Sequence, residues 1–417
     1  MRGETAVRRI SQAFVAGRVK RHLASVEGLE YLPIGRPFVL APNHRSYFDH
    51  FVMEILVGAA TGRPVWFLTK RESFEKTLSR LWTLAWYGIP VDRDTPSPDT
   101  LRTVQRILTS GDILCVYPEG TRNVDAELLP FKSGAFRFAL AADVPVIPVG
   151  MTGTDAVLPK GQKRFRAGGK VHLAFGPPLA VDRTVGKQRA AEAMSLQARQ
   201  SITDLIRQAE ADAMYGALAS AQAAAGRLLD RQITDSLDER GRLGTTDGKR
   251  LRLLASLLSA METRPHHVRV QQARLLGIRL LTLPKAVRPL PARAVRNTVE
   301  AVLQHDPHHR DANYLLGRWH LSMPAVLGGS ALQAADAFRR SADSSPTVDT
   351  RALAGLAEAY SALGRTEDMI RTLRTISAAS AAPHSREHAR IVRAQGRLAA
   401  LSATGEPRSE TVARSRP

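Results

Sequence analysis

The sequence predicts an α/β domain with a mixed, largely buried sheet flanked by helices, followed by an all-α helical-repeat domain. The first prediction rests on short apolar runs that alternate with helix-like segments between about residues 28 and 178. Apolar runs bounded by Pro and Gly are typical of buried strands, and strand–helix alternation is typical of α/β domains. The second prediction rests on a stretch that reaches about residue 403, contains few strand formers and includes repeat-like segments.

A basic amphipathic helix is expected at the N-terminus, within residues 1–27. Val7, Ile10 and Phe14 fall at helical spacing, and arginines and lysines surround them. Such a helix suits the interface of an anionic membrane. An ordinary surface helix packed on its own domain explains the same pattern equally well, so both interpretations stay open.

The α/β domain is expected over residues 28–208. Its predicted strands are the runs PFVLAP, VWFLT, GIPV, DILCVYP, VPVIPVGM and KVHLAFG. The segments between them predict helices at residues 47–60, 71–87, 98–109 and 132–143. Because the strands are almost continuously apolar, the sheet should be covered on both faces.

The rest of the chain is predicted to be helical, with a helical linker over residues 209–250 and the helical-repeat domain over residues 251–403. Two sets of residues resemble tetratricopeptide positions: Gly317, Ala334, Phe338 and Pro346, and then Leu356, Tyr360, Gly364 and Leu373. One repeat cannot bury its own apolar face, so several helix pairs must stack. The polar residues 404–417 are expected to form a disordered tail.

The composition favours anionic partners. The formal net charge is +20, which suits lipid headgroups, phosphorylated substrates or nucleic acid. No nucleic-acid recognition motif accompanies the charge, and an aromatic content of 6% leaves few stacking platforms. We therefore expect an anionic membrane surface as a partner and no nucleic acid.

The single cysteine and the hydropathy pattern indicate the compartment. Cys115 cannot form an internal disulfide, and its apolar surroundings favour a buried strand residue over a nucleophile. No apolar stretch approaches the ~20 residues that span a bilayer, and the N-terminus lacks the apolar core of a signal peptide. These features predict a cytoplasmic protein, peripheral on the inner face of the cell membrane.

Histidines in the second half raise the question of a metal site. They are His266, His267, His305, His308 and His309. They lie beside prolines in polar segments, without cysteine and without paired spacing on one helix face. Solvated loop histidines explain them better, so no metal ligand is assigned.

The segment PNHRSYFDHF carries the first chemical signal. Its His44 and Asp49 are separated by four residues and follow a predicted strand. With an ordinary pKa of about 6.5, histidine can take a proton from a hydroxyl near neutral pH. A carboxylate improves this base by fixing its tautomer and stabilising its positive charge. On its own, the spacing is better explained by a histidine that caps a helix.

Three further motifs contain candidate substrate ligands. In VYPEGTRN, Gly120 lets the backbone approach a substrate, Arg122 can hold phosphate with paired hydrogen bonds, and Glu119 can orient the substrate or a neighbouring arginine. In GIPVDRD, Arg93 follows a short strand, and in LPFKSGAF, Lys132 lies in a turn that opens a helix. A surface salt bridge of Arg93 and a solvated Lys132 are equally good explanations of these two.

Together, these motifs make the block from about Gly28 to Pro178 resemble the 1-acylglycerol-3-phosphate acyltransferase family. NHRSYFD is similar to its histidine–aspartate motif, GIPVDR to its arginine motif, YPEGTRN to its proline–glutamate–glycine–threonine–arginine motif and VPVIPV to its last motif. The resemblance implies transfer of a fatty acyl group from acyl-CoA or acyl-carrier protein to a hydroxyl of lysophosphatidic acid or a related lysophospholipid. The product would be phosphatidic acid, in phospholipid biosynthesis. The resemblance implies no cofactor, no metal and no covalent acyl-enzyme.

By that resemblance His44 is the general base and Asp49 its partner. The substrate-binding residues are then Asn43, Arg93, Glu119, Gly120, Thr121, Arg122 and Lys132. Tyr117 and Asn123 depart slightly from the family pattern, in which Phe or Val and Ser are frequent, and we expect neither to touch the proton transfer. An alternative function is a lipid-docked scaffold whose helical repeats bind a partner protein. The intact motifs favour the enzyme.

Overall fold

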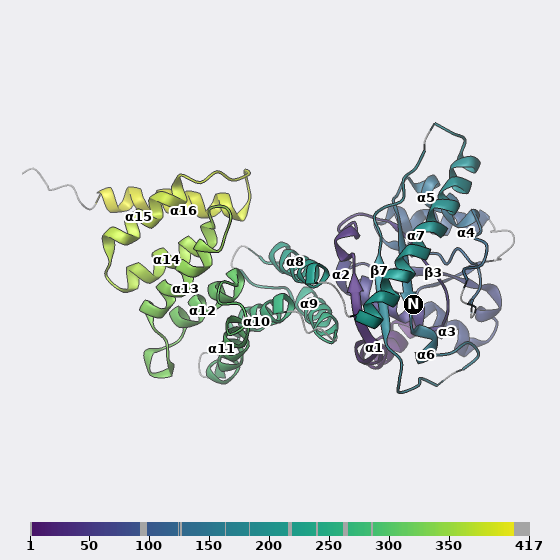
Figure 1. The fold of residues 1–417 in the computed structure, drawn as a ribbon, viewed down its shortest axis with the longest axis horizontal. Coiled ribbons are helices and arrows are strands. Elements are labelled where there is room, and N and C mark those ends of the chain that lie inside the picture. Colours follow the sequence, from purple (N-terminus) through teal and green to yellow (C-terminus); the bar gives the residue numbers. More distant parts are fainter. Residues whose placement is uncertain are drawn as a thin grey trace, which may run out of the picture. The chain divides into compact units, whose positions relative to one another are not determined.

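The computed structural model describes residues 2–91, 98–123, 125, 127–162, 164–182, 184–215, 219–238, 241–261, 266–284 and 287–403. The chain divides into two compact units, Met1–Leu275 and Leu276–Pro417. The first unit contains a sheet flanked by helices, and the described part of the second is helical (Figure 1). The predicted fold class is confirmed: a mixed sheet with flanking helices precedes an all-helical region.

One seven-stranded sheet with the order β1-β7-β6-β2-β5-β3-β4 forms the centre of the first unit. Its strands are β1 Leu23–Glu27, β2 Val39–Pro42, β3 Val65–Lys70, β4 Gly88–Val91, β5 Ile113–Cys115, β6 Val146–Thr152 and β7 Val171–Phe175. Every neighbouring pair is parallel except β6 and β7, which are antiparallel. Strand β1 was not among the predicted strands. The sequence LASVE directly follows the N-terminal helix, and its pairing with the distant β7 makes it a strand.

Helices flank this sheet (Figure 1). The helices up to residue 280 are α1 Arg2–His22, α2 Phe48–Thr61, α3 Thr77–Ala85, α4 Pro98–Thr109, α5 Gly134–Ala142, α6 Thr154–Val157, α7 Lys187–Tyr215, α8 Ala219–Asp235, α9 Thr245–Leu258 and α10 His266–Leu280. The four helices predicted between the strands correspond to α2, α3, α4 and α5. The segment predicted as a helix at 71–87 begins with a 3-10 turn, and α3 itself starts at Thr77.

Helix α2 is buried on nearly every side. Its buried apolar residues are Phe48, Val52, Met53, Ile55, Leu56, Val57, Ala59 and Ala60. A helix that is apolar all round must be covered all round, and α2 contacts α1, α9 and β3. From α9, Arg250 Nη1 donates a hydrogen bond of 3.0 Å to the Ala59 carbonyl near the end of α2. Helix α9, which lies beyond residue 208, therefore packs within the first unit. The domain borders expected at residues 208 and 250 stay predictions.

The N-terminal helix α1 packs on the first unit through one stripe and exposes another. Val15 and Val19 are buried, whereas Ile10 is 81% exposed and Phe14 is 55% exposed. Arg8 Nη2 donates a 2.9 Å hydrogen bond to Glu54 Oε1 of α2. Both interpretations of this helix thus have a physical basis, because its buried side anchors it and its exposed side carries large apolar groups.

Glu54 predicts a pH-dependent stability. Burial raises its pKa to about 8, although the Arg8 guanidinium and the Val65 amide lower it. Since the folded state keeps a proton that the unfolded chain releases above its ordinary pKa of about 4.5, stability should fall as pH rises towards 8, by about 1.4 kcal/mol per pH unit. In Glu54→Gln this slope should vanish. Thermal unfolding of the wild type and Glu54→Gln between pH 5 and 8 tests this. A difference in stability between the two proteins that does not change with pH would contradict it.

Six helices form the described part of the second unit beyond α10. They are α11 Pro289–Leu303, α12 Arg310–Ser322, α13 Ala331–Asp343, α14 Thr350–Ala362, α15 Thr366–Ser377 and α16 Arg386–Ala403. Successive helices pack against each other. Phe338 lies against Gly317 and Gly355, where an added Cβ would come within 3 Å of its ring. The repeat-like residues Phe338, Leu356 and Leu373 are accordingly buried.

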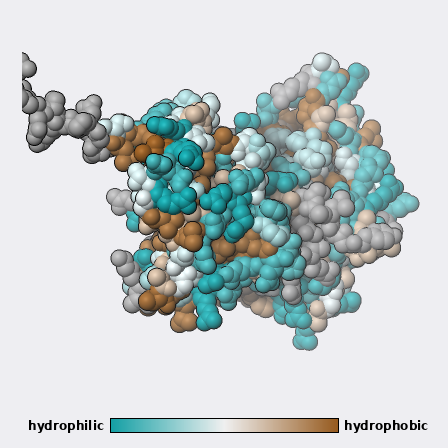
Figure 2. All heavy atoms as spheres, turned by 60° about the vertical axis from the view of Figure 1, so that its left-hand side comes forward, coloured by the Kyte–Doolittle hydropathy of each residue, from teal (hydrophilic) through white to brown (hydrophobic). Residues whose placement is uncertain are grey.

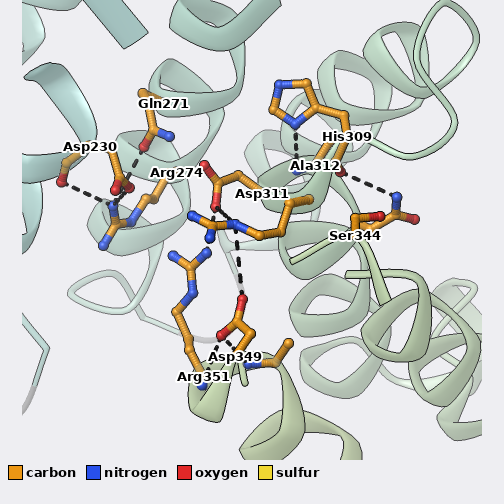
Figure 3. Close-up of polar contacts among 12 residues, drawn as sticks. Asp230, Gln271, Arg274, His309, Asp311, Ala312, Ser344, Asp349 and Arg351 are labelled. Atoms are coloured by element: carbon orange, nitrogen blue, oxygen red, sulfur yellow. Dashed lines mark hydrogen bonds and ion pairs between the residues drawn. The ribbon is translucent and has the colours of Figure 1, made fainter. Parts of the chain in front are cut away.

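Charged residues join helices α12 and α14 (Figure 3). Arg351 Nη2 donates to Asp311 Oδ1 at 2.5 Å, and its guanidinium lies 4.3 Å from the Tyr314 ring centroid. Asp349 caps α14 by accepting from the amides of Arg351 and Ala352. His309 caps α12 in the same way and is buried. The expectation that His309 is a solvated loop residue is therefore wrong, because its ring nitrogen accepts from the Ala312 amide.

No helix in the described part of the chain combines the length and apolar character needed to span a bilayer. On the face shown in Figure 2, hydrophobic residues form separate patches between hydrophilic ones.

Candidate active site

The site lies where two neighbouring parallel strands end. Strand β2 leads into the loop that carries His44, and β5 leads into the loop that carries Glu119 and Arg122. The register pairs Leu40 with Cys115, so both loops leave the sheet at the same edge. Carboxyl ends of parallel strands are a common position for binding sites in α/β folds.

His44 and Asp49 form the predicted pair. His44 Nδ1 lies 2.8 Å from Asp49 Oδ2. The same oxygen accepts from the amides of Arg45 at 2.8 Å and Ser46 at 2.9 Å, so Asp49 also closes the first turn of α2. A carboxylate can only accept, so Nδ1 carries the proton and Nε2 is left as the basic nitrogen. The His44 side chain retains 11% exposure, and the arrangement can remove a proton from a hydroxyl.

Glu119 ties the second loop to the first. The His44 amide donates to Glu119 Oε1 at 2.9 Å, and the Leu129 amide donates to Oε2 at 3.1 Å. The Asn123 amide in turn donates to the His44 carbonyl at 2.7 Å. Glu119 was predicted to orient the substrate or an arginine. Its carboxylate instead holds the backbone on which the histidine sits, and its role towards substrate stays a prediction.

Arg122 presents an unsatisfied cationic donor. Its guanidinium lies 3.5 Å from the ring centroid of Tyr47, and its Nη1 is buried without a hydrogen-bond partner among the described residues. Leaving a charged donor unpaired is costly, so this atom is suited to an anionic ligand. The other expected phosphate ligand, Arg93, lies within residues 92–97, outside the described part of the chain.

The remaining predicted ligands differ in what they can offer. Asn43 uses its whole amide on the Met151 backbone, donating at 2.9 Å and accepting at 2.8 Å, which favours a positioning role. Gly120 has a φ of 70°, a left-handed conformation that glycine adopts freely. The methylene carbons of Lys132 lie beside Gly120, and Thr121 is exposed at the end of this turn.

The expectation that neither Tyr117 nor Asn123 touches the proton transfer stays a prediction, although both residues lie beside His44. The Tyr117 and His44 rings stack with centroids 3.8 Å apart and an interplanar angle of 20°, and Asn123 bonds to the His44 backbone. His50 was also missed, and its ring centroid lies 5.7 Å from that of His44. These contacts follow from the pairing of β2 with β5, which no local pattern encodes.

Comparisons with known proteins agree with this geometry. Residues 24–152 match the family model described as Acyltransferase. The chain is 30% identical over 150 residues to a 1-acyl-sn-glycerol-3-phosphate acyltransferase of Bacillus subtilis, covering 36% of this chain and 70% of that protein. It is 29% identical over 195 residues to the mouse 1-acyl-sn-glycerol-3-phosphate acyltransferase alpha, covering 46% of this chain and 66% of that protein. The chain belongs to the 1-acyl-sn-glycerol-3-phosphate acyltransferase family.

The family-model match lies within the first unit. The chain spans just under two thirds of the length of the mouse relative, and the family model ends at residue 152. The solved structure of the 1-acyl-sn-glycerophosphate acyltransferase PlsC from Thermotoga maritima aligns with 49% of this chain and 84% of its own, at 24% identity and a TM-score of 0.37. The second unit, Leu276–Pro417, has no part in the family match.

Proposed function

We propose that this protein is an O-acyltransferase that moves a fatty acyl group from a thioester carrier to the free hydroxyl of lysophosphatidic acid, forming phosphatidic acid. The observation that carries the proposal is the 2.8 Å contact between His44 Nδ1 and Asp49 Oδ2, at the same sheet edge as Arg122. Membership in the family supports it. A purely scaffolding role has no need of an oriented histidine.

The proposed reaction is a direct transfer. His44 Nε2 takes the hydroxyl proton while the hydroxyl oxygen attacks the thioester carbonyl, and Asp49 stabilises the imidazolium that forms. The new carbon–oxygen bond forms as the carbon–sulfur bond breaks. The departing thiolate then takes the proton from His44, which restores the neutral base. Atoms and charge balance without a metal, a cofactor or an acyl-enzyme.

Arg122 is the proposed anchor for the acceptor's phosphate. Its buried, unpartnered Nη1 would gain a charge-assisted hydrogen bond to a phosphate oxygen. Tyr47, beneath the guanidinium, limits how far the side chain can move. Fixing the phosphate would hold the acceptor hydroxyl near His44, and such positioning is among the larger contributions to bimolecular catalysis.

The proposed location is the surface of an anionic membrane, on the inner face of the cell membrane. Helices α1 and α3 contact each other, and both expose large apolar side chains: Ile10 and Phe14 on α1, and Leu78 and Trp82 on α3. Arg9 and Lys20 are exposed on α1 as well. Exposed apolar and basic groups on one pair of helices suit the interface of an anionic bilayer.

The test offers the purified full-length chain a panel of lysolipids in anionic vesicles, with acyl-CoA or acyl-carrier protein as donor. Phosphatidic acid should form from lysophosphatidic acid, and lysolipids without a terminal phosphate should react far more slowly. In Arg122→Leu, KM for lysophosphatidic acid should rise about 10- to 100-fold, which corresponds to the loss of one charge-assisted bond. Lipid mass spectrometry identifies the product. A folded protein that acylates none of the lysolipids would refute the proposal.

A further inference from the structure

The Tyr117 ring contacts the imidazole of the proposed base, His44, whose orientation Asp49 fixes only in part. Asp49 holds the edge of the His44 ring through Nδ1. A hydrogen bond at one edge still permits the ring to tilt about that bond. The Tyr117 ring covers one face of the imidazole, with centroids 3.8 Å apart and planes 20° from parallel. Edge and face contacts together leave the ring one orientation.

Tyr117 is itself anchored from behind. The side chain is 9% exposed, and its hydroxyl lies 3.5 Å from His50 Nδ1. The His50 ring also packs on Phe67, with centroids 4.5 Å apart. His50 follows Asp49 directly on α2, so one helix controls both constraints: the edge contact through Asp49 and the face contact through His50 and Tyr117.

We propose that Tyr117 is a positioning residue that fixes the plane of the His44 imidazole and stabilises its positively charged form during proton transfer. Stacked aromatic pairs contribute beyond their buried area, and the face of a tyrosine ring attracts a cation. The inference deepens the proposed acyl transfer and rests on it. Its effect should fall on the chemical step, because Tyr117 contacts the base itself.

The surroundings of the stack favour this role. Burial lowers the pKa of His50 to about 3, with repulsion from His44 as the next cause. His50 is therefore neutral near pH 7 and adds no positive charge beside the imidazolium. Burial also raises the pKa of the Tyr117 hydroxyl well above its usual range, so this ring stays an uncharged surface and does not act as a second base.

Variants at Tyr117 distinguish the contribution of the aromatic ring from that of the hydroxyl. Tyr117→Phe keeps the ring and should retain kcat within about 3-fold, whereas Tyr117→Leu removes it and should lower kcat about 10- to 100-fold with KM for lysophosphatidic acid nearly unchanged. Phe136→Leu is the matched control, since Phe136 is a buried aromatic residue of α5 that belongs to none of these ring contacts, and a folded Phe136→Leu should keep the wild-type kcat. If Tyr117→Leu does not fold, Tyr117→Met replaces it.

A spectroscopic measurement tests the stack without turnover. Ring protons of His44, assigned by their loss in His44→Ala, should show the upfield shift of a stacked ring in the wild type and Tyr117→Phe, and should lose it in Tyr117→Leu or Tyr117→Met. Wild-type kcat in a folded variant without the ring, an equal loss in Tyr117→Phe, or an unshifted His44 ring in the wild type would each overturn the proposal. Absence of acyl transfer by the wild type would instead refute the proposed function, while the ring shifts still report on the stack.

Discussion

Replacing His44 by alanine is expected to lower kcat for acylation of lysophosphatidic acid by about 10³-fold or more while the protein stays folded. In the proposed base, His44 Nδ1 contacts Asp49 Oδ2 at 2.8 Å, which leaves Nε2 available to accept a proton. General base catalysis contributes roughly 10²- to 10⁴-fold, and an acceptor hydroxyl is a poor nucleophile without it. Initial rates at saturating acceptor and donor measure the effect directly.

The matched control for this result is His308→Ala, an identical substitution at an exposed histidine of the second unit. It should leave kcat unchanged. His44 is largely buried, and its backbone is held by Glu119 and Asn123, so removal of its ring should leave the loop in place. The unfolding temperature of His44→Ala should therefore stay close to that of the wild type. Substantial activity in a folded His44→Ala protein would eliminate the proposed mechanism.

Local sequence was sufficient to predict the central pair of the site. His44 and Asp49 belong to one strand–loop–helix segment, and this segment together with the other motifs was enough to predict the contact between the imidazole and the carboxylate in the first turn of α2. The apolar runs likewise predicted most of the sheet, because buried strands have few other sequence patterns. Predictions of this kind succeed when the interacting residues are close in sequence or share a strong pattern.

Contacts between distant segments could not be predicted in this way. Glu119 reaches the His44 amide across a sequence separation of 75 residues, and the contact exists because β2 lies beside β5 in the sheet. Tyr117 stacks on His44 for the same reason. Asn43 resembles a substrate ligand in sequence, yet its amide bonds to the Met151 backbone of β6, the other neighbour of β2. Strand order, which the sequence does not state, decides all three.

Residues 209–250, predicted as a helical linker, show the same limit of local sequence in the helical part, although the linker assignment itself stays a prediction. The pattern of this segment indicates helices but not which surface they cover. In the structure, α8 contacts β1, and α9 contacts α2. Arg250 from α9 bonds to the Ala59 carbonyl of α2 and also to Gln232 of α8. The helix that carries Asp49 is thus supported by a segment about 190 residues further along the chain.

Removal of everything after Tyr215 is therefore expected to abolish cooperative folding of the first unit, whereas a chain that ends at Leu280 should stay folded and active. Ending the chain at Tyr215 deletes α8 and α9, whose buried residues include Leu228, Leu229, Ile233, Leu251, Leu254, Leu257 and Leu258. A fully buried Leu or Ile contributes about 1.5–3 kcal/mol, and whole domains are stable by only about 5–15 kcal/mol.

The deletion would also expose the apolar side of α2 that α9 covers and would remove the Arg250 bond to its end. Size-exclusion chromatography, thermal unfolding by circular dichroism and acyl transfer should separate the two truncations. A chain that ends at Tyr215 and melts as cooperatively as the longer one would show that α8 and α9 merely rest on the first unit. If the chain that ends at Leu280 lost activity while folded, the helices beyond α10 would be required for catalysis. The packing of α9 on α2 argues against both of these outcomes, because α9 covers α2 and the support for Asp49 is complete before Leu280.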